Sequence, residues 1–142
     1  MKTVREVLKG KGSDIAAVAP GASVLDATRQ MSDQGVGSLL VMRDDKLLGV
    51  ISERDVVYKL VPADKSPVNT PVEEIMSSHV LFVTPQQTVD DCMALMTEKR
   101  VRHLPVVEED RIVGVVSIGD AVKAIVAEQQ FVIEQLENYI SS

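Results

Sequence analysis

Aromatic residues and cysteine are scarce in this sequence. Phe, Tyr and Trp make up 3% of the 142 residues, and Trp is absent, so aliphatic side chains must build the core. Valine-rich stretches among these aliphatic residues favour β-strands. The single cysteine, Cys92, excludes an intramolecular disulfide and fits a reducing compartment.

Basic residues are also few relative to acidic ones. The chain has 15 Lys and Arg against 21 Asp and Glu, which gives a formal net charge of -6. A protein that grips nucleic-acid phosphates without regard to sequence needs the opposite balance, so nucleic acid is not the expected partner. No apolar run approaches the ~20 residues that span a bilayer, and no signal core follows Met1. We therefore expect no membrane insertion and a cytoplasmic location.

The most informative feature that is present is an internal repeat. The composition, with 45% apolar and 25% charged residues, is typical of a globular protein. The segment 18–57 aligns with 83–122 without a gap, and 14 of the 40 aligned positions are identical. Two copies are too few for a solenoid. They indicate two units related by a pseudo-twofold axis, each covering the apolar face of the other.

Each repeat predicts the same order of elements, β-α-β-β-α, so the expected fold class is α+β. A short helix with a Thr-x-x-Glu capping box at Thr3 or Thr70 comes first, and Pro71 suits the first turn of the second one. The last helix of each repeat is predicted to start at Ser52 or Ser117. In the first repeat an extended segment is predicted at 15–18, an amphipathic helix at 24–31, and two strands at 38–42 and 47–51. In the second repeat the same elements are predicted at 80–84, 89–96, 103–107 and 112–116.

The junction between the last strand and the last helix repeats the pattern Gly-h-h-Ser-x-x-Asp, where h is apolar. The first copy is Gly49–Asp55 and the second is Gly114–Asp120. One interpretation is structural, because Ser followed three residues later by Asp is an N-cap with an acid at the positive end of the helix dipole. The other is ligand binding. A glycine in a strand can mark the close approach of a ligand or another backbone, and a carboxylate at a helix start suits a ribose next to a phosphate.

This repeated pattern, together with the strand Leu104–Val107, resembles the adenosine-binding signature of CBS domains, which are named after cystathionine β-synthase. The resemblance covers nearly all of residues 1–126, in the same order of elements. It implies two αβ units packed as a pseudo-symmetric pair, a Bateman module, with two clefts between them. Repeat 1 is then expected at 1–66, repeat 2 at 70–126, and a C-terminal helical extension at 127–142.

The resemblance also implies the residues of the site. In the family the signature Asp holds ribose hydroxyls, the signature Ser lies near ribose and phosphate, and apolar strand residues sandwich the adenine. By position, the ribose ligands become Asp55 and Asp120, with Ser52 and Ser117 as their companions. The adenine pocket is expected to contain Ile15, Leu39, Val50, Val80, Leu104, Pro105 and Val115.

The expected phosphate partners are unevenly distributed. Arg100, Arg102 and His103 resemble the basic stretch before Leu-Pro in nucleotide-sensing CBS domains, where the residues matching Arg102 and His103 face phosphates. The structural alternative is a solvated basic patch at a helix end. Repeat 1 lacks that pair, and Arg54 is the arginine that could reach a phosphate there. The two clefts are therefore expected to differ in affinity or in ligand.

Other chemistry finds little support in the sequence. Cys92 aligns with Ala27 on the inner face of the amphipathic helix, which predicts a buried structural thiol. His79 and His103 lack a second soft ligand at metal spacing, so no metal site is expected. No catalytic Ser/His/Asp set and no P-loop is indicated, so an enzyme is not expected.

Two functions from different classes stay open. The first is a non-catalytic regulatory sensor that binds an adenosine nucleotide, with AMP first and ATP, NAD or S-adenosylmethionine as alternatives, and acts on an unknown regulated protein. The second is a structural or interaction module whose clefts stay empty.

Beyond Asp120 the helical pattern continues to about Ile140, with an apolar stripe that needs a surface to cover it. We expect that surface on a second subunit, in a homodimer.

Overall fold

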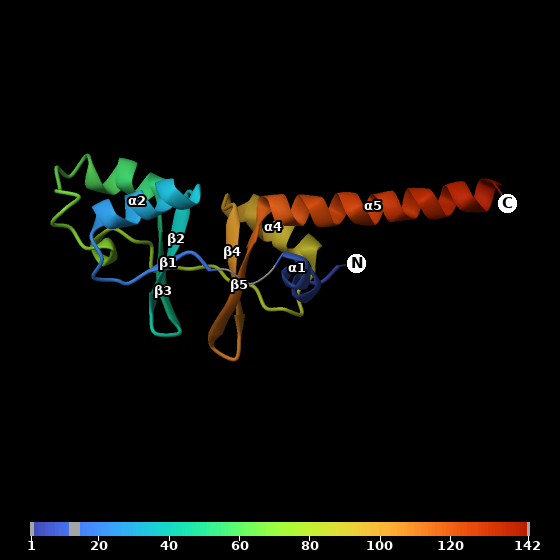
Figure 1. The fold of residues 1–142 in the computed structure, drawn as a ribbon, viewed down its shortest axis with the longest axis horizontal. Coiled ribbons are helices and arrows are strands. Elements are labelled where there is room, and N and C mark those ends of the chain that lie inside the picture. The colour runs from blue at the N-terminus through green and yellow to red at the C-terminus, as the bar shows by residue number, and fades with distance from the viewer. Residues whose placement is uncertain (1, 12–14, 142) are drawn as a thin grey trace. The chain divides into compact units, whose positions relative to one another are not determined.

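The computed structural model describes residues 2–11 and 15–141 (Figure 1). The predicted first residue of repeat 1, Met1, and the predicted last residue of the extension, Ser142, lie outside the described residues. The described chain combines helices with a three-stranded and a two-stranded sheet, which confirms the α+β fold class.

The chain forms two compact units. Unit 1 combines Met1–Asp14 with Leu81–Ser142, and unit 2 is Ile15–Val80. Unit 2 therefore holds the strands of repeat 1, and unit 1 holds the strand pair of repeat 2.

Unit 2 is built around the three-stranded sheet. Its elements are β1 (Ala17–Val18), α2 (Val24–Gln34), β2 (Ser38–Arg43), β3 (Lys46–Ser52), α3 (Glu53–Asp55), the π-helix η1 (Val56–Leu60) and the 3-10 helix η2 (Val72–Glu74). β2 pairs with β1 in parallel and with β3 antiparallel. The buried face of α2, formed by Val24, Ala27 and Met31, packs into the same core as β2 and β3, which confirms the predicted amphipathic helix.

Unit 1 holds the two-stranded sheet. Its elements are α1 (Val4–Lys11), α4 (Val89–Lys99), β4 (His103–Glu108), β5 (Arg111–Ser117) and α5 (Ile118–Ser141). β4 and β5 pair in the register of β2 and β3 at every aligned position of the repeats, with an irregularity at the same place. Cys92 and Met96 of α4 pack with Val4 and Leu104 in the core. The two predicted hairpins and the second amphipathic helix are therefore confirmed.

The third strand is reduced in unit 1 because Pro105 stands where unit 2 has Leu40. The Leu40 N–H donates to the carbonyl just before β1 at 3.0 Å and so joins β1 to β2. Proline has no N–H, so the matching hydrogen bond cannot form beside β4. The predicted extended segment 80–84 contributes an isolated parallel bridge, between Val83 and Val106, instead of a strand.

The first segment of each repeat packs in the unit of the other repeat. α1 comes from repeat 1 but lies in unit 1, where the Val4 N–H donates to the Gln87 carbonyl at 2.8 Å, just before α4. η2 comes from repeat 2 but lies in unit 2, where the Val72 N–H donates to the Ala22 carbonyl at 2.8 Å, just before α2. The boundaries of the compact units therefore differ from the boundaries of the repeats predicted from the sequence.

The two short helices begin differently. Thr3 caps α1, because the Glu6 N–H donates to Thr3 Oγ1 at 3.3 Å, as predicted. The prediction for Thr70 is wrong: Pro71 takes the N-cap position of η2, and no side-chain hydrogen bond caps that helix within the described residues. Thr70 is buried, and its carbonyl accepts a hydrogen bond from the Val24 N–H at 2.9 Å.

α5 continues beyond the core of unit 1 (Figure 1). Ala121 and Ala124 are buried against Val89, whereas every described residue from Val126 onward is exposed. The predicted helix over 122–140 is therefore confirmed. In the described part of the chain, no helix is both long enough and apolar enough to cross a bilayer.

Candidate functional site

Each hairpin ends in a Ser-x-x-Asp box at the start of the following helix. In unit 2 the Ser52 N–H donates to Asp55 Oδ2 at 2.9 Å, and the Asp55 N–H donates to Ser52 Oγ at 3.3 Å. In unit 1 the same two hydrogen bonds join Ser117 and Asp120, at 2.9 Å and 3.1 Å. The helix-capping interpretation of the motif therefore holds in both repeats.

Asp55 has a further partner that the signature pattern does not include. Its side chain is 12% exposed, and its Oδ1 lies 3.0 Å from the Nζ of Lys59, four residues along the chain. Lys59 Nζ also donates to the Ile75 carbonyl at 3.2 Å. The Asp-x-x-x-Lys spacing is the signal that could have revealed this ion pair, since residues four apart share a helix face. When the gap-free alignment of the repeats is continued along the last helix, Ala124 stands in place of Lys59.

The structure brings two predicted phosphate residues of unit 1 next to its Ser-x-x-Asp box. His103 pairs with Ser117 at the end of the β4–β5 hairpin, and the Arg102 carbonyl accepts a hydrogen bond from the Ile118 N–H at 2.8 Å. The side chains of Arg102 and His103 are exposed. The residues Arg102 and His103 thus lie beside the N-terminus of α5, the end of a helix that favours anions.

The other two predicted phosphate residues are held differently. Arg100 ends α4 in the left-handed region, at φ 56, at the position where α2 has Gly35 at φ 66. Arg54 lies over the ring of Tyr58, with its Cζ 5.4 Å from the ring centre, as in a cation–π pair. Arg100 is therefore two residues from Arg102 at the end of a helix, and Arg54 has an aromatic partner of its own.

The predicted adenine residues divide into core and accessible positions. Leu39 in unit 2 and Leu104 in unit 1 are 1% and 0% exposed and belong to the two cores, so a ligand cannot reach them in this conformation. Pro105 is buried as well. The half-buried positions are Ile15, Val50, Val80 and Val115. Of the seven predicted residues, only these four are therefore accessible to an adenine.

The two signature glycines are crowded by the protein itself. A Cβ at Gly49 would lie 2.6 Å from the Ser77 carbonyl oxygen, and a Cβ at Gly114 would lie 2.7 Å from a methyl group of Leu8. Val50 and Ser77 form an antiparallel bridge next to Gly49, with both N–H···O distances at 2.9 Å. The close approach that these glycines permit is therefore to the chain's own segments, and it does not by itself indicate a ligand.

We expect Gly49→Ala to lower the free energy of unfolding by about 1–3 kcal/mol, the usual effect of overpacking. The new methyl group would meet backbone that two hydrogen bonds hold in place. Gly114→Ala should lower it by under about 1 kcal/mol, because the Leu8 side chain can adopt another rotamer. Urea denaturation of the two variants measures the difference, and equal losses would contradict this account.

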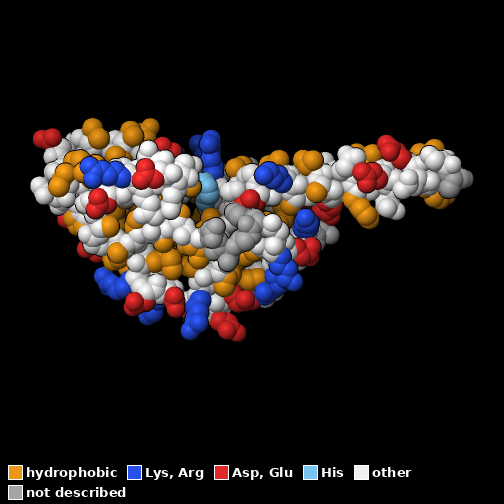
Figure 2. Space-filling model, viewed as in Figure 1, with side chains coloured by type: hydrophobic (Ala, Val, Ile, Leu, Met, Phe, Trp, Pro, Cys, Tyr) orange, Lys and Arg blue, Asp and Glu red, His pale blue; other side chains and the backbone are white. Residues whose placement is uncertain are grey.

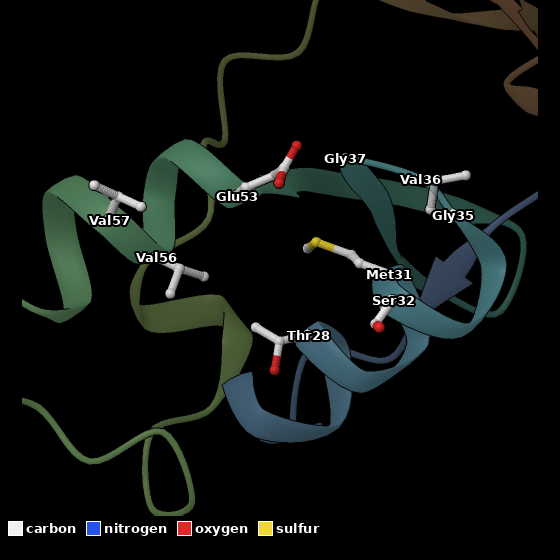
Figure 3. A pocket seen from close by; sticks show the side chains of 9 residues that line it. All are labelled: Thr28, Met31, Ser32, Gly35, Val36, Gly37, Glu53, Val56 and Val57. Carbon is white, nitrogen blue, oxygen red and sulfur yellow. The ribbon is translucent and has the colours of Figure 1, made fainter.

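A hollow of about 530 Å³ lies next to the Ser-x-x-Asp box of unit 2 (Figure 3). Met31 extends into it from α2, and Glu53 borders it from α3 (Figure 3). The lining residues are Thr28, Met31, Ser32, Gly35, Val36, Gly37, Glu53, Val56 and Val57. At the aligned positions of repeat 2, Arg100 and Arg102 replace its two glycines. The two units therefore differ in charge at this place.

Neither cysteine chemistry nor a metal centre is indicated by the described residues. Cys92 is fully buried, and burial, with a smaller effect from the charge of Asp91, raises the pKa of its thiol to about 11. The thiol therefore stays protonated at neutral pH, as expected of a structural cysteine. Within 2–11 and 15–141, no group of three or more His, Cys, Asp or Glu side chains is placed to hold a metal ion.

Known proteins resemble this chain over most of its length. The model of the CBS domain family matches it twice, over residues 4–62 and 72–127. The mitochondrial CBS domain-containing protein CBSX3 of Arabidopsis thaliana is 35% identical over 147 residues, covering 97% of this chain and 71% of that protein. The solved structure of a protein with CBS domains from Burkholderia ambifaria has a TM-score of 0.83 and 44% identity, covering 90% of this chain and 96% of that one.

A third comparison shows the fold alone. A CBS domain pair solved in complex with 5′-methylthioadenosine and S-adenosyl-L-methionine has a TM-score of 0.76 and 22% identity, covering 90% of this chain and 98% of that one. Each of the two family matches contains one hairpin and one Ser-x-x-Asp box. The chain therefore belongs to the CBS-domain family and carries two copies of the domain.

Proposed function

We propose that this chain is a non-catalytic regulatory module that binds an adenosine nucleotide and acts through a partner protein. The observation that carries the proposal is the box of Ser117 and Asp120 with Arg102 and His103 beside it. A carboxylate, a helix start and two basic residues therefore belong to the same end of one hairpin. These groups suit the two hydroxyls of a ribose and a phosphate attached to it.

Adenosine is the part of the ligand that we assign to this site. Asp120 as the ribose acceptor and the half-buried Val115 against the base would serve AMP, ATP, NAD and S-adenosylmethionine alike. AMP is our first choice, because Arg102 and His103 offer partners to a single phosphate without a metal ion. The complex of a similar fold with 5′-methylthioadenosine and S-adenosyl-L-methionine supports the adenosine class.

A structural or interaction module is the second candidate function. The observation in its favour is that both Ser-x-x-Asp boxes are already closed by their own hydrogen bonds. In that case the signature residues cap two helices, and the chain contributes only its surfaces to an assembly.

Calorimetric titration with adenosine, AMP, ATP, NAD and S-adenosylmethionine separates the two candidates. We expect at least one of these ligands to bind. Arg102→Ala should weaken AMP and ATP about tenfold or more and leave adenosine nearly unchanged, since a hydrogen bond to a charged group contributes roughly 1.5–3 kcal/mol.

Arg111→Ala is the matched control for this titration. Arg111 is also exposed, but it lies at the other end of the same hairpin, opposite Glu108. Its loss should leave every affinity unchanged. If the wild-type protein binds none of the five ligands, the structural module is the better function. Equal losses of adenosine and AMP in Arg102→Ala would contradict the phosphate contact.

The module is also proposed to work as a homodimer. Apolar side chains of α5 are exposed along the helix where it leaves the core of unit 1 (Figure 2). Closed symmetric dimers are the commonest way for a soluble chain to cover such a surface.

A further inference from the structure

The π-helix η1 changes which side chains of the last helix in unit 2 face the core. In unit 1 the residue four positions after the signature aspartate, Ala124, is buried. In unit 2 the buried residue is Leu60, five positions after Asp55, and Lys59 at the fourth position is exposed. A π-helix bonds each N–H to the fifth residue before it, which accounts for the extra residue. Lys59 is thereby turned out of the core and toward Asp55.

Lys59 is held there by one ion pair and one hydrogen bond. Its Nζ lies 3.0 Å from Asp55 Oδ1, and it donates to the Ile75 carbonyl at 3.2 Å. The lysine side chain is 48% exposed. The pair therefore places the ammonium group directly against the predicted ribose acceptor of unit 2.

The carboxylate of Asp55 already has partners at both oxygens. An ionised carboxylate offers about four lone-pair positions, two on each oxygen. Ser52 donates twice to Oδ2, through its N–H at 2.9 Å and its hydroxyl at 3.1 Å. The ammonium group of Lys59 lies 3.0 Å from the other oxygen, Oδ1. A ribose brings two adjacent hydroxyl donors, and both would have to reach Oδ1 beside that ammonium group.

We propose that Lys59 is an internal substitute for the ribose in unit 2, so that the chain binds one adenosine ligand rather than two. This inference rests on the proposed function and assigns the ligand to unit 1, where Arg102 and His103 lie beside the Ser117 box. Ala124 stands at the position that matches Lys59, so no lysine competes from there. Lys59 is thus a specificity-determining residue for the signature of repeat 1.

The number of ligands bound per chain tests the proposal. Calorimetric titration with AMP, and with adenosine in parallel, should give one site in the wild-type chain. Lys59→Met removes the ammonium group and keeps a long side chain, and it should give two sites. The second site should disappear again in the double variant Lys59→Met/Asp55→Asn, because Asp55 is the acceptor that the first substitution releases.

Lys65→Met is the matched control. Lys65 is another half-exposed lysine of unit 2 with a carboxylate partner, 3.5 Å from Glu74 Oε2, and its loss should leave the one-site titration unchanged. Lys59→Gln repeats the test if Lys59→Met proves unstable to urea. Two sites in the wild-type chain, or one site in the folded Lys59 variants, would overturn the inference and leave the proposed function in place. If neither the wild type nor the Lys59 variants bind AMP or adenosine, the proposed function itself is overturned.

Discussion

Asp120→Asn is expected to weaken AMP binding about ten- to hundredfold. The substitution keeps the shape of the side chain but removes its charge, and a hydrogen bond to a charged group contributes roughly 1.5–3 kcal/mol. Asp120 lies at the start of α5, next to Arg102 and His103, so the proposed ribose and phosphate partners share one helix end. Calorimetric titration of the variant with AMP measures the change in affinity.

The helix cap that Asp120 forms is a separate effect and has its own control. Asp91 closes a box of the same kind with Thr88 at the start of α4, in the same unit. Asp91→Asn should lower the free energy of unfolding by about 0.3–1 kcal/mol, as Asp120→Asn does, because each removes an acid from a helix N-terminus. AMP affinity should not change in Asp91→Asn. If Asp120→Asn loses stability but keeps its affinity, ribose binding is refuted and the structural module remains.

The features that the sequence predicted correctly depend on residues close together in the chain. The hairpins and the amphipathic helices each lie within one repeat, and the gap-free alignment of the repeats supplies a second, independent copy of every pattern. The boxes at Ser52 and Ser117 follow from the Ser-x-x-Asp spacing alone, since an N-cap and its acid are neighbours on the first turn. The core faces of α2 and α4 follow in the same way from the period of the α-helix.

The features that the sequence could not show depend on distant segments. The exchange of α1 and η2 between the units joins residues such as Val4 and Gln87, and no local pattern encodes that pairing. The capping box predicted at Thr70 is replaced by an N-cap at Pro71, and the next N–H, that of Val72, donates to the carbonyl of the distant Ala22. Alternation along a strand sends every second side chain to one face. The resemblance alone did not tell which face of β2 holds Leu39, and the structure places it in the core.

The last helices of the two repeats differ by a shift of one residue in the position that faces the core, and Lys59 shows the consequence. On a regular helix the fourth residue after the signature aspartate faces the core, as Ala124 does in unit 1. The same spacing in unit 2 places a lysine beside Asp55, because η1 shifts the core position to Leu60. Identical signatures can therefore sit in different electrostatic surroundings, and sequence identity of the motif does not guarantee equal ligand binding.

The apolar stripe of α5 has the spacing of a helix that pairs with another helix. Its positions alternate by four and three residues, the seam of a coiled coil. They are Val122, Val126, Gln129, Ile133, Leu136 and Ile140. The apolar members are between 45% and 82% exposed, which is a large apolar surface to leave in water.

Charge distinguishes the possible partners of this stripe. Beyond Lys123, the described part of α5 contains Glu128, Glu134 and Glu137 and no Lys or Arg. Two copies of the helix would bring like charges together, and salt screens such repulsion. The proposed homodimer should therefore become tighter as the salt concentration rises. A complex with a basic partner would become weaker.

Ile133→Glu/Leu136→Glu is expected to raise the Kd of the homodimer at least about a hundredfold. Each copy loses two apolar side chains that contribute about 1.5–3 kcal/mol each when fully buried, and it gains two more negative charges beside those of its partner. Gln135→Glu/Asn138→Glu adds the same charge on the face of α5 turned away from the stripe and should leave the dimer intact. Sedimentation velocity at micromolar concentration, at low and high salt, measures both variants. A monomeric wild-type chain, or a dimer that survives in Ile133→Glu/Leu136→Glu, would show that the stripe does not hold two copies together.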